Sequence, residues 1–278
     1  MSVLSFVAIC LAMLMIVYVI VRVLRNRSQE RGLGGKMLAI SGYWDLNGKS
    51  RQGYGHENYL NRFKDTTAFN VDYVMYGTDE ITSHIQRLRK HKLTHRRNLS
   101  YDSLVRKCET EFHCENILDK ISKTSLHDPE HCPSAQLLLV WIAKVLVVRD
   151  AMQSFPEYTH YGWIDAGYKG QIKDPERPWP SASLDNVQGL YVRRLENACH
   201  DQYWKRGLEK CPIACMWFGD KQTISEFVDH CIEIIRDQLS SGGTVCTEQD
   251  VFEIARQRIA HKVREIETKD GEYDAIFL

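Results

Sequence analysis

The chain has 278 residues, of which 44% are hydrophobic and 26% are charged, which is typical of one globular domain of moderate size. Its 36 Lys/Arg residues balance its 36 Asp/Glu residues, so bulk charge excludes nucleic acid as an expected partner. Its nine cysteines follow no tight framework, which indicates mostly reduced thiols rather than a disulfide scaffold or paired zinc knuckles.

The first segment is strongly apolar. Only Ser5 and Tyr18 are mildly polar between Val3 and Val21, and the run reaches the roughly 20 residues that a helix needs to span a bilayer. A cleaved signal peptide would have a shorter apolar region, a basic start and a cleavage site. We therefore expect a transmembrane anchor in the lipid bilayer over residues 1–24, a short stem over 25–36 and one domain over 37–278.

The charges beside the anchor predict its orientation. Arg22, Arg25 and Arg27 follow the apolar run and nothing basic precedes it, so the positive-inside bias favours the cytoplasmic face for the domain. Anchors of lumenal enzymes have the opposite asymmetry. The lumenal side of the ER or Golgi therefore stays open as the alternative.

The domain alternates predicted strands with predicted helices. The strands are expected at Met37–Trp44, Val71–Tyr76, Thr159–Ile164 and Leu190–Leu195. The apolar spacing predicts helices at Ser134–Met152, at Lys221–Leu239 and from about Thr247. This alternation predicts an α/β fold with a mainly parallel sheet flanked by helices.

Several local signals predict where helices begin and end. Ser134 is placed to cap the first of the long helices, and either Asp220 or a capping box of Thr223 and Glu226 is placed to cap the second. Glycines at 242 and 243 are expected to end it. We expect the basic run Arg87–Arg97 to continue a helix as a solvated face, with a phosphate or anionic-lipid contact as the alternative.

The stretch from Tyr161 to Gly167 is the most informative for function. It places one carboxylate, Asp165, where a strand rich in β-branched and aromatic residues ends and glycine allows a turn. Ligands of open α/β sheets gather at the carboxyl ends of strands, so we expect Asp165 to face a crevice. A loop that carries Pro175, Pro178 and Pro180 follows and is expected to lie over a pocket as a flap.

Four blocks of the sequence together resemble the HtrL/YibB-like family, whose members look like nucleotide-sugar glycosyltransferases of the GT-A type. The blocks are Ser41-Gly42-Tyr43-Trp44, Cys132-Pro133 leading to Trp141 and Lys144, Trp163-Ile164-Asp165-Ala166-Gly167, and Trp217-Phe218-Gly219-Asp220. The resemblance implies a GT-A-like fold and a nucleotide-sugar donor. It implies transfer of a sugar to a hydroxyl acceptor on a glycan or glycoprotein.

The resemblance also implies roles for single residues. Asp165 would stand at the donor diphosphate, where it could hold Mn²⁺ or Mg²⁺, and Asp250 would be the acceptor-side catalytic base. Donor-binding positions would be Ser41, Gly42, Tyr43, Trp44, Asp79, Lys144, Arg193, Trp217 and Gly219. GT-A enzymes commonly carry Asp-x-Asp, whereas this chain has a lone Asp165, so the metal is an open question. Without one, Lys144, Arg193 or Arg194 would neutralise the phosphates.

Each of these residues also has a structural interpretation. Asp165 could form an Asx-type turn, and Asp79 or Thr78 could cap a helix. Asp250 forms a variant capping box with Thr247, and Glu248 is then the alternate base. Trp217 could pack in the core, and His131 beside a proline turn is more often a loop residue.

The sequence thus predicts a membrane-anchored glycosyltransferase with Asp165 at the donor phosphates. The first alternative is a non-catalytic glycan-binding or scaffold protein that retains the fold. The second is a metal-dependent phosphohydrolase that uses the same strand-end carboxylate.

Overall fold

The computed structural model describes residues 35–47, 55–64, 71–124, 132, 134–166, 184, 187–196, 210–242 and 247–268. The predicted anchor, most of the stem, the proline-bearing flap and His131 lie outside these ranges. Within them, the search for a helix with the length and apolar character to span a bilayer finds none.

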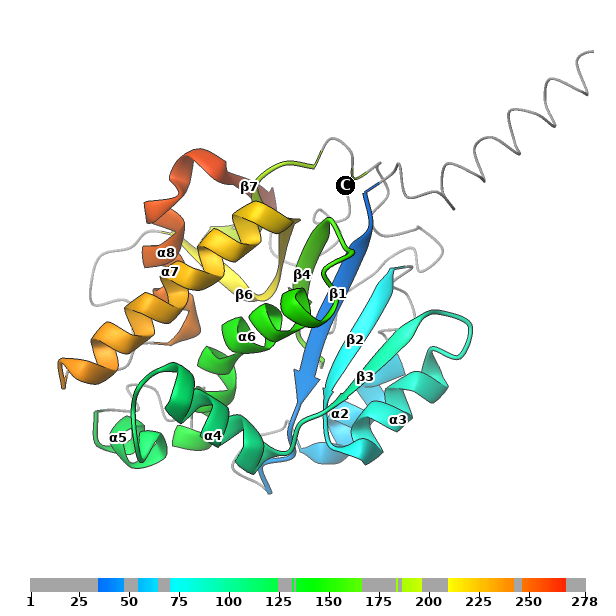
Figure 1. Ribbon diagram of the computed structural model, residues 1–278, viewed down its shortest axis with the longest axis horizontal. Coiled ribbons are helices and arrows are strands. Elements are labelled where there is room, and N and C mark those ends of the chain that lie inside the picture. The colour runs from blue at the N-terminus through cyan, green and yellow to red at the C-terminus, as the bar shows by residue number, and fades with distance from the viewer. Residues whose placement is uncertain are drawn as a thin grey trace, which may run out of the picture.

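Within the described ranges, seven strands form one sheet in the order β3-β2-β1-β4-β6-β5-β7 (Figure 1). Their bounds are β1 Met37–Tyr43, β2 Asp72–Gly77, β3 Thr94–Asn98, β4 His160–Ile164, β5 Leu190–Glu196, β6 Lys210–Asp220 and β7 Val263–Thr268. The four strands predicted from the sequence are confirmed as β1, β2, β4 and β5. The prediction missed β3, β6 and β7.

The sheet is mixed rather than simply parallel. β1 pairs in parallel with β2 and β4, β2 with β3, and β5 with β7. β6 runs antiparallel to both of its neighbours, β4 and β5. The expectation of a mainly parallel sheet therefore holds for most pairings, and β6 is the exception.

The direction in which successive strands are added to the sheet reverses at β1. From β1 the chain moves to β2 and β3 on one side, and it then returns to place β4 on the other side of β1. All four strands point the same way, so their carboxyl ends form one edge. A reversal of this kind leaves a crevice at the carboxyl ends of the two central strands, which is where ligands of such sheets bind.

Helices cover both faces of the sheet. Their bounds are α2 His56–Arg62, α3 Asp79–Leu88, α4 Tyr101–Glu111, α5 Ile117–Thr124, α6 Ala135–Ser154, α7 Lys221–Ser240 and α8 Glu248–Arg258, with the short η3 Ala260–Lys262 before β7. The larger core packs α4 to α8 on one face, with α6 and α7 crossing it (Figure 1). The smaller core packs α2 and α3 on the other face.

The ends of α6 and α7 show which of the predicted capping residues form capping hydrogen bonds. Ser134 Oγ accepts a hydrogen bond from the Leu137 N–H at 3.1 Å, which confirms the predicted cap of α6. The α7 cap is Asp220, whose Oδ1 accepts from the Thr223 N–H at 2.9 Å. The alternative capping box of Thr223 and Glu226 was wrong, because Thr223 is already inside the helix. α7 ends at Ser240, before Gly242 in the left-handed region with φ of 66°.

The basic run was also assigned wrongly. α3 ends at Leu88 and the chain turns into β3, so Arg87–Arg97 is not a continuous helix. β3 is an edge strand whose residues are increasingly exposed toward its end, and charged residues on such an edge discourage pairing with other chains. The parallel ladder with β2 decides the conformation here, and the run of charges conceals it from sequence analysis.

Candidate functional site

Asp165 lies at the carboxyl end of β4, at the reversal between β1 and β4. Its backbone N–H donates to the Cys215 carbonyl oxygen at 2.8 Å, which extends the pairing with β6 by one residue. The Trp163 indole Nε1 donates to Asp165 Oδ1 at 2.6 Å, and the side chain of Asp165 is 35% exposed. Within the described part of the chain, Oδ2 has no hydrogen-bond partner. The carboxylate is therefore oriented through one oxygen and offers the other.

Lys144 connects Asp165 to a distant helix. Its side chain extends from α6 and is only 3% exposed, and its Nζ lies 2.9 Å from Asp165 Oδ1 and 3.2 Å from Glu248 Oε1. Nζ also donates to the Ala214 carbonyl oxygen at 3.4 Å. An ammonium group has three protons, and these three oxygens account for all of them. Lys144 therefore orients Asp165 and has no proton left for a phosphate.

Burial and charge act in opposite directions on this cluster. Burial by itself lowers the pKa of Lys144, but the Asp165 and Glu248 carboxylates outweigh it and raise the pKa above its ordinary value. Burial raises the pKa of Glu248, the charge of Asp165 adds to this, and the Lys144 ammonium opposes it. With all three groups ionised, the cluster carries one surplus negative charge.

The first turn of α8 brings Glu248 to this cluster. Asp250 Oδ2 accepts from the Thr247 N–H at 3.3 Å and from Thr247 Oγ1 at 3.1 Å, as expected for a capping box at the start of α8. Asp250 thus has the structural role that its spacing allowed. Glu248, the alternate in the sequence analysis, is the α8 carboxylate that reaches Lys144.

The block at the end of β1 is buried. Ser41, Tyr43 and Trp44 lie in the interior, and the Trp44 Nε1 donates to the Leu99 carbonyl oxygen at 2.8 Å. A Cβ on Gly42 would lie 2.6 Å from the Trp44 ring, so glycine is needed for that ring to fold back over the strand. In this structure the four residues pack the end of β1, and none of them presents a side chain at the surface.

The Trp217 block is also part of the core. Trp217 is fully buried, with its ring edge-to-face against Phe227 at 5.4 Å and against Phe252 at 5.5 Å between centroids. A Cβ on Gly219 would lie 2.3 Å from the Gly189 carbonyl oxygen, so glycine allows β5 and β6 to approach. These contacts match the packing interpretation of both residues.

Asp79 is placed differently from these buried residues. It is the first residue of α3, at the carboxyl end of β2, and its exposed carboxylate pairs with Arg96 and accepts from Asn98 Nδ2 at 3.1 Å. Thr78 occupies the cap position, but its side chain makes no capping hydrogen bond. Arg193 lies in β5, and its side chain is outside the described part of the structure.

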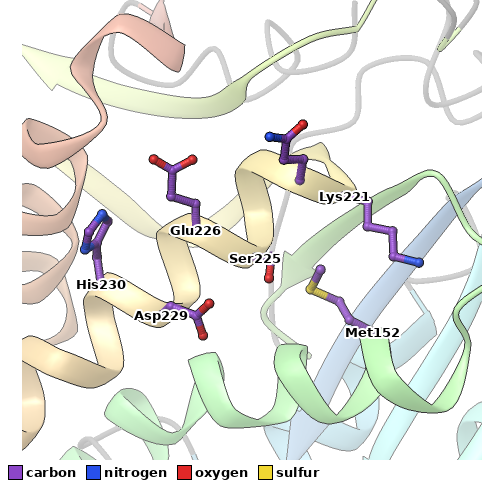
Figure 2. A pocket seen from close by; sticks show the side chains of 7 residues that line it. Met152, Lys221, Ser225, Glu226, Asp229 and His230 are labelled. Carbon is purple, nitrogen blue, oxygen red and sulfur yellow. The ribbon is translucent and has the colours of Figure 1, made fainter.

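A larger cavity lies at the opposite edge of the sheet. Its volume is about 690 Å³, and Figure 2 shows Ser225, Glu226, Asp229 and His230 of α7 beside Met152 of α6. β6 runs against β4, so α7 begins at the amino ends of the parallel strands, where His160 pairs with Asp220. The cavity is therefore remote from the reversal, and we do not assign the site to it.

Comparison with known proteins gives only distant likenesses. No family model and no curated protein matches the chain. A glycosyltransferase involved in the glycosylation of the major capsid of PBCV-1 is 13% identical, with a TM-score of 0.42, over 84% of this chain and 81% of that chain. Mouse xyloside xylosyltransferase 1, in its apo form, is 10% identical, with a TM-score of 0.46, over 88% of this chain and 93% of that chain.

The likeness is one of architecture. This chain is similar to those glycosyltransferase structures in having a mixed α/β sheet flanked by helices. At identities and TM-scores this low, neither protein supports an argument about the activity or the residues of this chain.

The residues present fit a cation only if a ligand completes its coordination. No group of three His, Cys, Asp or Glu residues in the described ranges could hold a metal ion. Cys108, Cys114, Cys132, Cys215 and Cys231 are free thiols. Asp165 Oδ2 is one hard oxygen on a carboxylate that Trp163 and Lys144 already orient. Mg²⁺ and similar ions can use one protein carboxylate together with phosphate oxygens.

Proposed function

We propose that this chain is a glycosyltransferase that transfers a sugar from a nucleotide-sugar donor to a hydroxyl acceptor. One observation carries the proposal: a half-exposed carboxylate, Asp165, stands at the reversal between β1 and β4 with one oxygen held and the other available. That is where a nucleotide ligand of an α/β sheet places its phosphates. The resemblance to the HtrL/YibB-like family stays a prediction of the sequence.

The chemistry requires that the charge of the leaving diphosphate be neutralised. Asp165 would hold a divalent cation, which would supply positive charge at the leaving diphosphate. Lys144 would act as a positioning residue. It fixes the Asp165 carboxylate and keeps one buried positive charge beside it.

Transfer to a hydroxyl also requires a group that takes the acceptor proton. Glu248 and Asp250, both in the first turn of α8, are the candidates. Glu248 is favoured by its contact with Lys144 and by burial, which raises its pKa toward the range useful for a base. Asp250, by contrast, already accepts hydrogen bonds as a helix cap.

The proposal is tested by assaying transfer and hydrolysis over a panel of nucleotide sugars, with and without Mn²⁺. Asp165→Asn should lower kcat/KM roughly a hundredfold or more, because it removes the carboxylate that would hold the cation at the phosphates. Asp119→Asn is the matched control, since Asp119 is an exposed carboxylate paired with Lys123 on α5. Circular dichroism should show that both variants are folded.

Each alternative has its own outcome in this assay. An absence of both turnover and nucleotide-sugar binding would contradict the proposal and favour a scaffold. Release of phosphate from simple phosphomonoesters would favour a phosphohydrolase. Turnover that is equal in Asp165→Asn and Asp119→Asn would show that Asp165 is not at the donor phosphates.

We also propose that the domain is anchored to a membrane, on the strength of the apolar run Val3–Val21 alone. The flanking arginines favour the cytoplasmic face. Protease treatment of intact vesicles should then digest the domain, and its protection until detergent is added would place it on the lumenal side.

A further inference from the structure

A second, smaller cavity lies on the α6 side of the sheet near the ends of β2 and β3. Its volume is about 290 Å³, enough for a phosphate group and part of its carrier. The lining comes from four elements and the turn after β3. The residues are Tyr76, Arg96, Arg97, Asn98, Leu99, Lys107 and Asp150.

One carboxylate organises this cavity. Asp150 Oδ2 accepts from the Tyr76 hydroxyl at 2.8 Å and from Arg97 Nη2 at 3.3 Å, and Oδ1 accepts from Lys107 Nζ at 2.9 Å. Burial would raise the pKa of Asp150, but hydrogen bonds from Lys107 and Tyr76 and the charges of Lys107 and Arg97 lower it. Asp150 is therefore ionised and well supplied with donors.

The two cations are not used up by this carboxylate. A guanidinium has five N–H donors and an ammonium three, and within the described residues Arg97 and Lys107 each direct one of them to Asp150. The side chains of Arg97 and Lys107 are 43% and 27% exposed, whereas that of Asp150 is 22% exposed. Two positive charges thus meet one negative charge, and both cations are more exposed than the carboxylate.

The remaining arginine does not change this balance. Arg96 pairs with Asp79, so its charge is matched by a carboxylate outside the cavity. One cation would balance the charge of Asp150, whereas Arg97 and Lys107 supply two. The second cation is in excess.

The wall of the cavity is fixed by the backbone. The Leu99 N–H donates to the Gly77 carbonyl oxygen at 2.8 Å, and the Leu99 carbonyl oxygen accepts from the Trp44 indole. A site with a fixed wall loses less conformational entropy when a ligand binds.

We propose that this cavity binds a phosphate group, held by Arg97 and Lys107 and kept at a distance from Asp150. The planar fork of an arginine matches two phosphate oxygens, and a lysine adds a point charge. The site is separate from Asp165, because it lies across β1 on the β2 and β3 side of the sheet. It does not depend on the proposed sugar transfer.

The test is a calorimetric titration of the folded chain with inorganic phosphate at low ionic strength. Binding should be saturable, and Arg97→Gln and Lys107→Gln should each weaken it about tenfold, as expected for one charge-assisted hydrogen bond. Asp150→Asn should tighten binding, because among the described residues it removes the only negative charge in contact with the two cations. Arg106→Gln is the matched control, since Arg106 is an exposed cation of α4 outside the cavity.

Several results would overturn the proposal. One is an absence of saturable phosphate binding. Another is that Arg106→Gln weakens phosphate binding as much as Arg97→Gln does. Weaker binding in a folded Asp150→Asn variant would also contradict it. Phosphate binding should be unchanged in Asp165→Asn, and its loss there would mean that the phosphate occupies the donor site instead. Failure of the glycosyltransferase assay leaves this titration unaffected.

Discussion

Helix α6 carries two ion clusters of opposite sign. Lys144 lies between the carboxylates of Asp165 and Glu248, whereas Asp150 lies between Arg97 and Lys107. The two α6 residues are six positions apart, which is about 9 Å along the helix axis. In each cluster a single charge from the helix is outnumbered by the opposite charge from strands and neighbouring helices.

The clusters differ most in their exposure. Lys144 is enclosed by its partners, so its cluster orients groups and depends on each member being present. Arg97 and Lys107 are partly exposed, so a ligand can approach their cluster from solvent. A charge enclosed by its partners serves positioning, and a charge with spare donors at a cavity serves binding.

Breaking the cluster around Lys144 should lower the free energy of unfolding more than any other change proposed for these clusters. Lys144→Met leaves Glu248 buried without a counter-charge, and such a loss costs about 3–5 kcal/mol of unfolding free energy. Urea unfolding followed by circular dichroism measures it. Lys123→Met, which breaks an exposed pair with Asp119, should cost less than about 1 kcal/mol. Equal losses in the two variants would show that Lys144 is not enclosed as described.

A double variant sharpens this result. Lys144→Met with Glu248→Gln removes the unpaired buried carboxylate, so it should be more stable than Lys144→Met alone. A further loss of stability in the double variant would mean that Glu248 is stabilised by something other than Lys144.

A smaller effect is expected at the start of α8. Asp250→Ala removes the cap that places Glu248, and loss of such a cap costs about 1 kcal/mol. Thr247→Ala should cost a similar amount, and the two losses should not add, because the residues bond to each other. If Asp250 were instead the base, kcat would fall roughly 10²- to 10⁴-fold in a protein that remains folded.

The smallest expected effect is the pH dependence of the unfolding free energy. Its sign differs between Glu248 in one cluster and Asp150 in the other. Because the pKa of Glu248 is raised, the folded protein holds that proton more tightly, so stability is lost as the pH rises above about 4 through the folded pKa. The pKa of Asp150 is lowered, so its stabilisation is complete above about pH 4 and is lost as the pH falls through the folded pKa.

Unfolding free energies of the wild type, Glu248→Gln and Asp150→Asn between acidic and neutral pH measure these contributions. The unfolding free energy of the wild type relative to Asp150→Asn should grow with pH and then level off. The unfolding free energy of the wild type relative to that of Glu248→Gln should fall as the pH rises. Slopes of the same sign in both comparisons would contradict the contrast between the clusters.

The sequence by itself determined the features that depend on neighbours along the chain. The strand that ends at Asp165, the Ser134 cap of α6 and the end of α7 before Gly242 each follow from residues within one turn or one strand. Local hydrogen bonds and apolar periodicity set these features, so they can be predicted from the sequence.

Only the tertiary structure decided how those pieces form a site. Glu248 lies 104 positions from Lys144, and no periodicity indicates that the two meet or that Lys144 also contacts Asp165. The strand β3 is concealed in a basic run, because its pairing with β2, and not its own pattern, makes it a strand. Contacts of this kind depend on which elements become neighbours in the sheet, and that is settled when the whole core packs.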